Sequence, residues 1–224
     1  MVEREDQMKK VLVIGMYDNA MYHPLTGVDE ALRGMFPELE FNVTDQIMTL
    51  CEADQYDGIV SYWDDWNEPI PDQAAEALYE YVKKGGSLLV LHNGISLQLQ
   101  DSLAKMIGGR FITHPQQEVI TFLVKDHELT KSCKEFELME EPYRFELEDD
   151  RKEIFLTYTY RGKEYPAGWR KTFGEGKVVY LMPGHTADKF TCEEYIRLIR
   201  NGMDWLGTNE NFPQICRKLS QFLI

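Results

Sequence analysis

The stretch Lys84-Gly85-Gly86-Ser87-Leu88-Leu89-Val90-Leu91-His92-Asn93-Gly94 decides the fold that we predict for this chain. Its two glycines end an amphipathic helix expected from Pro71 to Lys84, because glycine readily ends helices. The largely apolar run 87–91 is typical of a strand buried on both faces of a parallel sheet. The strand leads into a sharp turn at His92, and a further helix is expected from about Ser96. This order of helix, strand, turn and helix predicts an α/β protein.

The pattern on either side of this stretch extends the prediction to the whole chain. Before it, strands are expected at about 9–15, 38–44 and 56–63, with a helix at about 25–36. From about residue 118 strands follow one another without long helices, at 118–124, 136–138, 154–160 and 164–172. A strand at 177–182 and a helix at 192–206 then restore the alternation. We therefore predict a doubly wound, mostly parallel sheet with helices on both faces and an inserted antiparallel β stretch.

Length and composition indicate one ordinary globular domain. The chain has 224 residues, of which 43% are hydrophobic and 28% are charged. We expect a single domain across 1–224, with its core at about 9–207 and a terminal helix at about 209–224. The apolar residues of that terminal helix could form an interface between copies, so a homo-oligomer is a further expectation.

The charge and the cysteines exclude several classes of protein. Lys and Arg number 24 against 38 Asp and Glu, which gives a net charge of −14 and argues against a nucleic-acid partner. No apolar run is long enough to span a membrane, and the first residues do not form a signal peptide. The four cysteines are widely spaced and include no C-x-x-C pair. We therefore expect a cytoplasmic protein with reduced thiols and no membrane partner.

Polar and aromatic residues follow several of the predicted strands, at the edge where open parallel sheets bind ligands. Three of the five histidines lie there. Asp64 and Asp65, which also follow a strand, are expected to be solvated loop acids. Trp63 and Trp169 suit stacking on a sugar, and packing in the core is an equally weighted alternative. The residues at the predicted strand ends include Tyr17, His23, Trp63, Asn93, His92 and His185.

His92 occupies the position at which nucleophile elbows project one side chain over the sheet edge. Acyl transfer would need a cysteine or serine there, so we do not expect a cysteine-dependent glutamine amidotransferase. Imidazole instead suits a general base or a metal ligand, because its pKa is near neutrality and its nitrogens bind divalent cations.

Six motifs in order along the chain together resemble one known family. The chain resembles the ThuA-like (trehalose utilisation) family, which has the flavodoxin-like fold of class I glutamine amidotransferases. The resemblance covers about residues 9–207. The motifs are the stretch 84–94 quoted above, Ile107-Gly108-Gly109-Arg110-Phe111-Ile112-Thr113-His114-Pro115, Glu140-Glu141-Pro142-Tyr143, Tyr165-Pro166-Ala167-Gly168-Trp169, the segment 174–186, and Ile199-Arg200-Asn201-Gly202-Met203-Asp204-Trp205.

The resemblance implies roles for particular residues. The family's elbow residue is typically histidine, as His92 is here, and His185 takes the place of the amidotransferase histidine. The family's acidic pair followed by tyrosine implies Glu141 and Tyr143, and its His-Pro motif implies His114. His23 lies in an early loop where other members often carry an additional histidine, which this chain lacks. Family members are associated with the use of sugars, including keto-sugars.

These observations lead to one leading hypothesis and an alternative. The leading hypothesis is a cytoplasmic enzyme of carbohydrate utilisation, acting on trehalose, a keto-sugar or another small sugar as an isomerase or hydrolase. Its catalytic residues would be His92, His185, Glu141 and Tyr143, of which the first three could hold a divalent metal such as zinc or act without one. The alternative is a non-catalytic sugar-binding or regulatory module. The residues expected to contact substrate are His23, Tyr17, Trp63, Asn93, His114 and Trp169.

Overall fold

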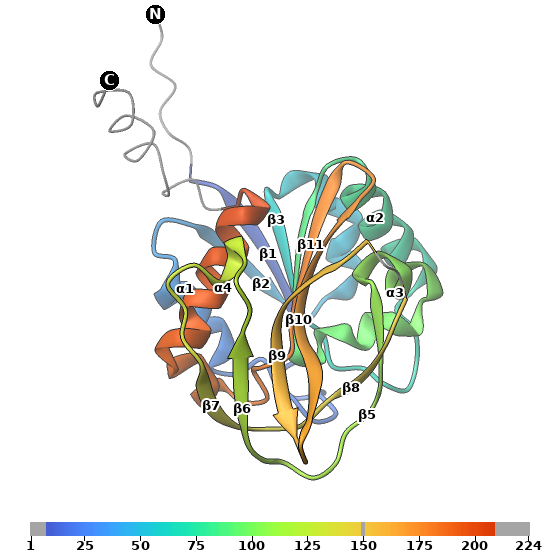
Figure 1. Ribbon diagram of the computed structural model, residues 1–224. Helices are drawn as coiled ribbons and strands as arrows, with labels where there is room; N and C mark the ends of the chain where they lie inside the picture. Colours follow the sequence, from blue (N-terminus) through green and yellow to red (C-terminus); the bar gives the residue numbers. More distant parts are fainter. Residues whose placement is uncertain (1–7, 149–150, 209–224) are drawn as a thin grey trace, which may run out of the picture.

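The computed structural model describes residues 8–148 and 151–208, which form a mixed α/β fold around one large sheet (Figure 1). The sheet has nine strands, and its first five pair in parallel. All of these strands except the one at the edge are buried almost throughout, as continuous apolar runs require of strands covered on both faces. In spatial order they are β2 (Glu40–Thr44), β1 (Lys10–Gly15), β3 (Gly58–Tyr62), β4 (Ser87–Leu91) and β11 (Gly176–Leu181).

The predicted antiparallel stretch continues the same sheet beyond β11. Four strands pair there in antiparallel fashion: β10 (Lys163–Phe173), β9 (Glu153–Tyr160), β6 (Glu118–Val124) and β7 (Phe136–Glu140). A separate two-stranded sheet, β5 (Gly109–Thr113) with β8 (Arg144–Leu147), was not expected. Both of its strands are short and only partly buried, so their sequences lack the regular alternation that indicates a strand.

Helices flank the sheet on both sides. Helices α1 (Val28–Met35) and α4 (Glu193–Leu206) lie on one side, while α2 (Asp72–Lys83) and α3 (Asp101–Ile107) lie on the other (Figure 1). Segments of 3₁₀ helix also lie in the connections between elements: η1 (Ile47–Gln55), η2 (His92–Leu99), η3 (Glu128–Thr130) and η4 (Ala187–Thr191). Within the described residues no helix is both long and apolar enough to cross a membrane. The expected terminal helix at 209–224 lies outside the described residues.

The turn after β4 differs from the prediction. Instead of a helix from about Ser96, the chain forms the 3₁₀ helix η2 from His92 and begins α3 only at Asp101. Nearly every residue from His92 to Gln98 is buried, whereas a surface α-helix buries one face only. His92 itself has a φ of 43°, which few non-glycine residues adopt. The buried turn therefore holds the His92 imidazole at the edge of the sheet.

Candidate metal centre

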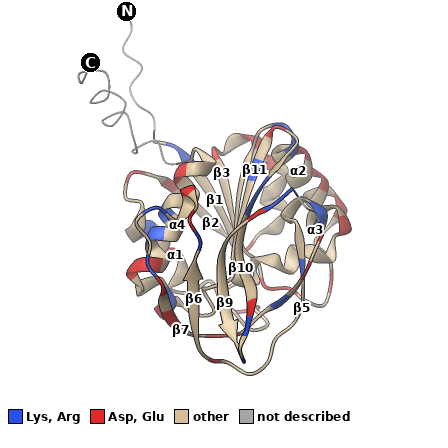
Figure 2. Cartoon of the chain, in the orientation of Figure 1, with Lys and Arg blue, Asp and Glu red and all other residues tan. Residues whose placement is uncertain are grey.

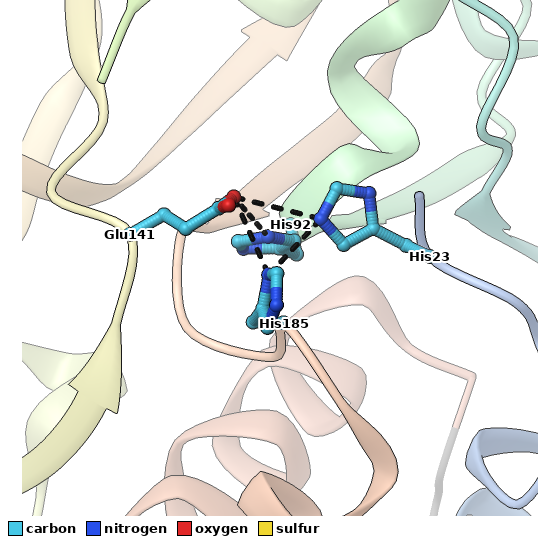
Figure 3. A group of neighbouring side chains, drawn as sticks. All are labelled: His23, His92, Glu141 and His185. Carbon is cyan, nitrogen blue, oxygen red and sulfur yellow. Dashed lines mark hydrogen bonds and ion pairs between the residues drawn. The ribbon is translucent and has the colours of Figure 1, made fainter. Parts of the chain in front are cut away.

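Four side chains from four different strand ends converge at one edge of the sheet (Figure 3). His23 follows β1, His92 follows β4, Glu141 follows β7 and His185 follows β11. One nitrogen or oxygen atom from each side chain lies within 4.8 Å of the corresponding atom of every other. The structure therefore brings together the three predicted ligands, His92, His185 and Glu141, and adds His23 to them.

The separations within this cluster match the size of a metal site. The Oε2 atom of Glu141 lies 3.3 Å from His185 Nδ1, 3.5 Å from His23 Nε2 and 3.6 Å from His92 Nε2. His23 Nε2 and His185 Nδ1 are 3.0 Å apart. Four ligands held about 2.0–2.1 Å from a tetrahedral zinc ion lie roughly 3.3–3.4 Å from one another. The four atoms thus surround a space of the right size for one ion.

Two buried atoms of the cluster need a partner that the described side chains do not supply. His92 Nε2 and Glu141 Oε2 are both buried, and neither has a hydrogen-bond partner among the described residues. Such orphaned polar atoms are rare in native interiors, where they call for an unseen partner such as an ion. Imidazole and carboxylate are ligands that zinc and similar divalent ions accept. The donor set therefore fits a divalent transition metal.

Two of the imidazoles are oriented from behind by fixed acceptors. His23 Nδ1 lies 2.9 Å from Asp64 Oδ1, and His92 Nδ1 lies 2.6 Å from the carbonyl oxygen of Met182. Each acceptor accepts a hydrogen bond from Nδ1–H, so Nε2 is the nitrogen that faces the cluster and that can bind an ion. Metal-binding histidines show this arrangement almost always, because it fixes both the tautomer and the ring orientation.

Asp64 corrects one sequence-based expectation. The structure places it at 0% exposure instead of in solvent. Besides His23 Nδ1, its carboxylate accepts the backbone N–H groups of Tyr22 and His23 and the indole N–H of Trp66. Burial alone would raise the pKa of Asp64, but these hydrogen bonds lower it, so the carboxylate is held charged. The position of Asp64 directly after a buried strand was the signal that could have revealed it.

Glu140 is a second buried acid that the sequence did not reveal. Its Oε1 accepts the backbone N–H groups of Gly184 (2.7 Å) and His185 (3.3 Å), so it fixes the loop that carries His185. Gly184 has a φ of 126°, a conformation that side chains rarely adopt. Burial raises the pKa of Glu140 to about 7, although both backbone donors oppose the shift.

The electrostatics of the four clustered residues differ sharply. Burial would lower the pKa of His23, but its hydrogen bond with Asp64 and the nearby carboxylate of Glu141 raise it to about 9. His92 has no such carboxylate behind it, and burial lowers its pKa to about 4. For Glu141, burial would raise the pKa, and the three imidazoles that face its carboxylate, those of His185, His23 and His92, lower it far below its ordinary value. At neutral pH the cluster therefore offers an ionised carboxylate and a neutral His92.

Two other predicted residues lie against the cluster. The ring centroid of Tyr143 is 4.6 Å from that of His92, and Tyr143 is almost completely buried. Burial raises the pKa of its hydroxyl well above 10, so it stays protonated. His114 is about a third exposed, with its Nδ1 3.8 Å from Glu141 Oε1. Tyr143 therefore packs inside the site against His92, and His114 lies at its more exposed side beside Glu141.

The other residues that were predicted to contact substrate occupy different positions in the structure. Asn93 Nδ2 donates to the carbonyl groups of Tyr62 and Trp63, and this holds the turn beside His92. Trp63 is buried, with no hydrogen-bond partner for its indole N–H among the described residues. The Tyr17 hydroxyl donates to Asp29, in helix α1, rather than to a residue of the cluster.

Trp169 is a core residue rather than a sugar platform. It has 0% exposure, donates its indole N–H to Ile107 and packs its ring 4.3 Å from that of Tyr180. A fully buried ring has no face open to a ligand, so the prediction that Trp169 contacts substrate is not supported.

Two surface hollows, of about 520 and 690 Å³, contain none of the four clustered residues.

Several solved structures have folds similar to that of this chain. The chain is similar to a ThuA-like protein from Bacteroides uniformis ATCC 8492, at 16% identity and a TM-score of 0.73, over 91% of this chain and 93% of that one. It is similar to a ThuA-like protein from Parabacteroides merdae ATCC 43184, at 16% identity and a TM-score of 0.71, over 90% and 91% of the two chains. A cytoplasmic protein from Salmonella typhimurium LT2 has 15% identity and a TM-score of 0.64, over 88% and 99%.

These likenesses show a shared fold, and the sequence decides the family. No curated protein has a sequence that matches this chain significantly. The sequence pattern of the family described as ThuA, trehalose utilisation, matches residues 10–206. This match confirms the resemblance seen in the sequence, and the α/β fold is consistent with the amidotransferase-like architecture. The chain belongs to the ThuA (trehalose utilisation) family.

Proposed function

We propose that the protein is a metal-dependent enzyme of carbohydrate utilisation that acts on a small sugar or keto-sugar. Membership of the trehalose utilisation family supports a role in carbohydrate utilisation. The observation that carries the enzymatic part is the convergence of three imidazoles and one carboxylate within 4.8 Å. A set of this kind at a sheet edge suits chemistry on a polarised oxygen more than it suits stabilisation of the fold.

The chain's own residues have distinct parts in this proposal. His23, His92, His185 and Glu141 would hold the ion, with Asp64 and the Met182 carbonyl fixing two of the imidazole rings. A divalent ion held there would supply Lewis-acid polarisation of a sugar carbonyl or diol. Glu141 and His185 are 14% and 20% exposed, so the cluster is open to solvent on their side. Substrate would enter from that side.

Tyr143 and His114 are the candidates for proton transfer. Tyr143 keeps its proton because burial raises its pKa, so it would donate a hydrogen bond to a substrate oxygen. The imidazole of His114 is partly exposed beside Glu141 and would take or return the proton on the carbon next to a ketone. Such proton movement is isomerase chemistry, and hydrolysis would use the same groups to activate water.

We also infer a flavodoxin-like strand order and a cytoplasmic location. The parallel order β2-β1-β3-β4-β11 is the order of a flavodoxin-like, doubly wound sheet, with β11 in fifth place. A cytoplasmic location accords with the cytoplasmic Salmonella typhimurium protein that shares the fold. Asn93, which follows His92 in the sequence, and Trp63, which precedes Asp64, are further candidate substrate contacts.

Exchange of carbon-bound protons for deuterium tests the proposal directly. A panel of keto-sugars in heavy water is followed by proton NMR with metal-loaded wild type, with chelator-treated wild type and with His92→Ala. We expect exchange, or product formation, with the loaded wild type only. His127→Ala is the matched control, because His127 pairs with Glu153 away from the cluster. Full activity after chelation would contradict the proposal. Saturable sugar binding without any turnover would support the sugar-binding module instead.

A further inference from the structure

Arg144 differs from the other half-buried arginines of the described chain. Arg110 pairs with Asp101 and Glu148, Arg170 with Glu128 and Glu153, and Arg197 with Glu194. Arg144 is equally half-buried, yet no carboxylate oxygen lies within 4.0 Å of it among residues 8–148 and 151–208. A guanidinium withdrawn from water without an anion is costly, so this one calls for an anionic partner that the described residues do not supply.

Tyrosines hold the Arg144 guanidinium in place. Its carbon atom Cζ lies 3.6 Å from the ring centroid of Tyr165, 4.6 Å from Tyr160 and 5.5 Å from Tyr158. One of its N–H groups donates to the Tyr158 hydroxyl. Stacking on aromatic faces leaves the edge of a guanidinium free, and that edge matches a carboxylate or phosphate with two parallel hydrogen bonds. The cage therefore presents a preorganised donor.

A second arginine lies close to the same tyrosines. The Arg161 guanidinium lies over the Tyr160 ring, at 5.1 Å, so one tyrosine contacts both arginines. Burial lowers the pKa of Arg144, the neighbouring Tyr165 and Tyr160 partly offset this, and Arg161 lowers it further. Basic residues are also visible on the β9–β10 hairpin near its turn (Figure 2). In a chain with a net charge of −14, this local positive patch is unusual.

A continuous set of contacts connects this patch with the metal cluster. The Tyr143 ring packs on His92, and the Tyr143 carbonyl accepts the Tyr158 hydroxyl at 2.7 Å. The same Tyr158 oxygen receives the hydrogen bond from Arg144. Arg144 is also three residues from Glu141 along the chain, which limits their Cα separation to roughly 10 Å. The segment after β7 and the β9–β10 turn lie at the same end of the molecule (Figure 1).

We propose that Arg144, assisted by Arg161, binds an oxyanion group on the substrate while the sugar's reacting end lies at the His23–His92–Glu141–His185 cluster. The substrate class is thus an anionic sugar, a sugar phosphate or a sugar acid, rather than a neutral disaccharide. This inference rests on the proposed function for the position of the sugar. The arginine site itself stands on the contacts of Arg144, whether or not a metal is bound.

Calorimetric titration with three related probes tests the inference. Glucose, gluconate and glucose 6-phosphate are titrated into wild type, both metal-loaded and chelator-treated. We expect at least one anionic probe to bind about ten-fold or more tightly than glucose, because charged hydrogen bonds to guanidinium are strong. Arg144→Gln is expected to remove that preference, Arg144→Lys to keep part of it, and Arg161→Gln to weaken it by about two- to three-fold. Which anion is preferred shows whether the group is a phosphate or a carboxylate.

Arg200→Gln is the matched control, because Arg200 is an exposed arginine stacked over Phe36, on helix α4. It should leave the anion preference unchanged. Equal affinity of wild type for all three probes, or an unchanged preference in Arg144→Gln, would overturn the inference. If Arg144→Gln does not fold, two other measurements test the inference. The anion preference should weaken in Arg161→Gln, whose substitution lies in the exposed turn, and it should be lost in wild type at high salt. Metal content is measured in parallel: an anion preference without metal binding would refute the proposed function and leave this inference standing.

Discussion

At the scale of single residues, the protonation of the cluster depends on the group that accepts a hydrogen bond from Nδ1 of His23 and of His92. His23 and His92 both turn Nε2 toward Glu141, but a buried carboxylate supports one and a backbone carbonyl supports the other. The carboxylate makes His23 strongly basic, with a pKa near 9, whereas His92 has a pKa near 4. At neutral pH, metal binding must therefore displace a proton from His23 but none from His92.

The first prediction concerns Asp64→Asn, which removes the charge behind His23 while keeping the size of the side chain. We expect metal affinity to fall by about 10- to 100-fold, as for other carboxylates that support a metal-binding histidine. Competition with a coloured chelator measures the change. Asp65→Asn is the neighbouring control, because the Asp65 carboxylate accepts the backbone N–H of Asn67 instead. Equal affinity in the two variants would show that Asp64 does not support the site.

The second prediction concerns the stability of metal-free protein in alkali. The folded-state pKa of His23 is raised from 6.5 to about 9, so its stabilising contribution is complete below pH 6.5 and is lost as the pH rises to 9. His92, with a pKa of about 4, titrates below this range, whereas Glu140, with a pKa of about 7, adds to the loss only at its lower end, so the loss above about pH 8 belongs to His23. Melting temperature should therefore fall between pH 7 and 9 in chelator-treated wild type.

The variant His23→Asn tests this assignment, because it lacks the titrating group. Its melting temperature should change less over the same range, while His127→Asn should behave as wild type does. Parallel pH profiles for His23→Asn and wild type would assign the alkaline loss of stability to another group.

At the scale of elements, the β4–η2 turn fixes where the chemistry can occur. Gly94 permits it, since a Cβ atom there would overlap the backbone carbonyl of Ser61 in β3. The backbone of β3 cannot move away easily because it pairs on both sides within the sheet. The turn is thus built by close approach of two chain segments.

The third prediction is that Gly94→Ala destabilises the fold by about 2 kcal/mol or more and also weakens metal binding. Denaturant unfolding and chelator competition measure the two effects. Gly34→Ala is the control: Gly34 lies in helix α1 with open space around it, so alanine should stabilise the protein by about 0.5–1 kcal/mol. An unchanged free energy of unfolding in Gly94→Ala would contradict the packing described for the turn.

The sequence predicts the elements that contain a continuous apolar run, but not those whose conformation depends on tertiary packing. The strand 87–91 was predicted at its observed bounds because a run of buried residues is a local signal. The strands β5 and β8 and the 3₁₀ helix η2 carry no such signal. The strand-end rule gathered His92, His185 and His23, and the family resemblance added Glu141. Asp64 and Glu140 were missed because the burial of an acid at a strand end depends on what packs over it in the folded chain, and the strand-end position of Asp64 was only a partial signal.

At the scale of the whole molecule, the site unites distant parts of the chain. Its four residues span positions 23 to 185 and follow β1, β4, β7 and β11, so the parallel and antiparallel parts of the sheet both contribute. Unfolding would separate all four side chains. Binding of an ion to this site must consequently stabilise the complete fold.

The fourth prediction follows from this linkage. Adding a divalent transition metal to chelator-treated wild type should raise the melting temperature, with a gain of about 2.7 kcal/mol when free metal is 100 times the Kd. Glu141→Ala should show a much smaller shift. Scanning fluorimetry with zinc, manganese and nickel would also rank the metals. An equal shift in wild type and Glu141→Ala would place the binding elsewhere.

The central claim, that His23, His92, Glu141 and His185 form one metal site, is tested most directly by elemental analysis of the purified protein. Wild type and the four single alanine variants are expressed with added transition metals and analysed by mass spectrometry against protein concentration. We expect about one ion per wild-type chain, with substantial loss in each variant and none in His127→Ala. Wild type without stoichiometric metal, or variants that retain it in full, would contradict the account.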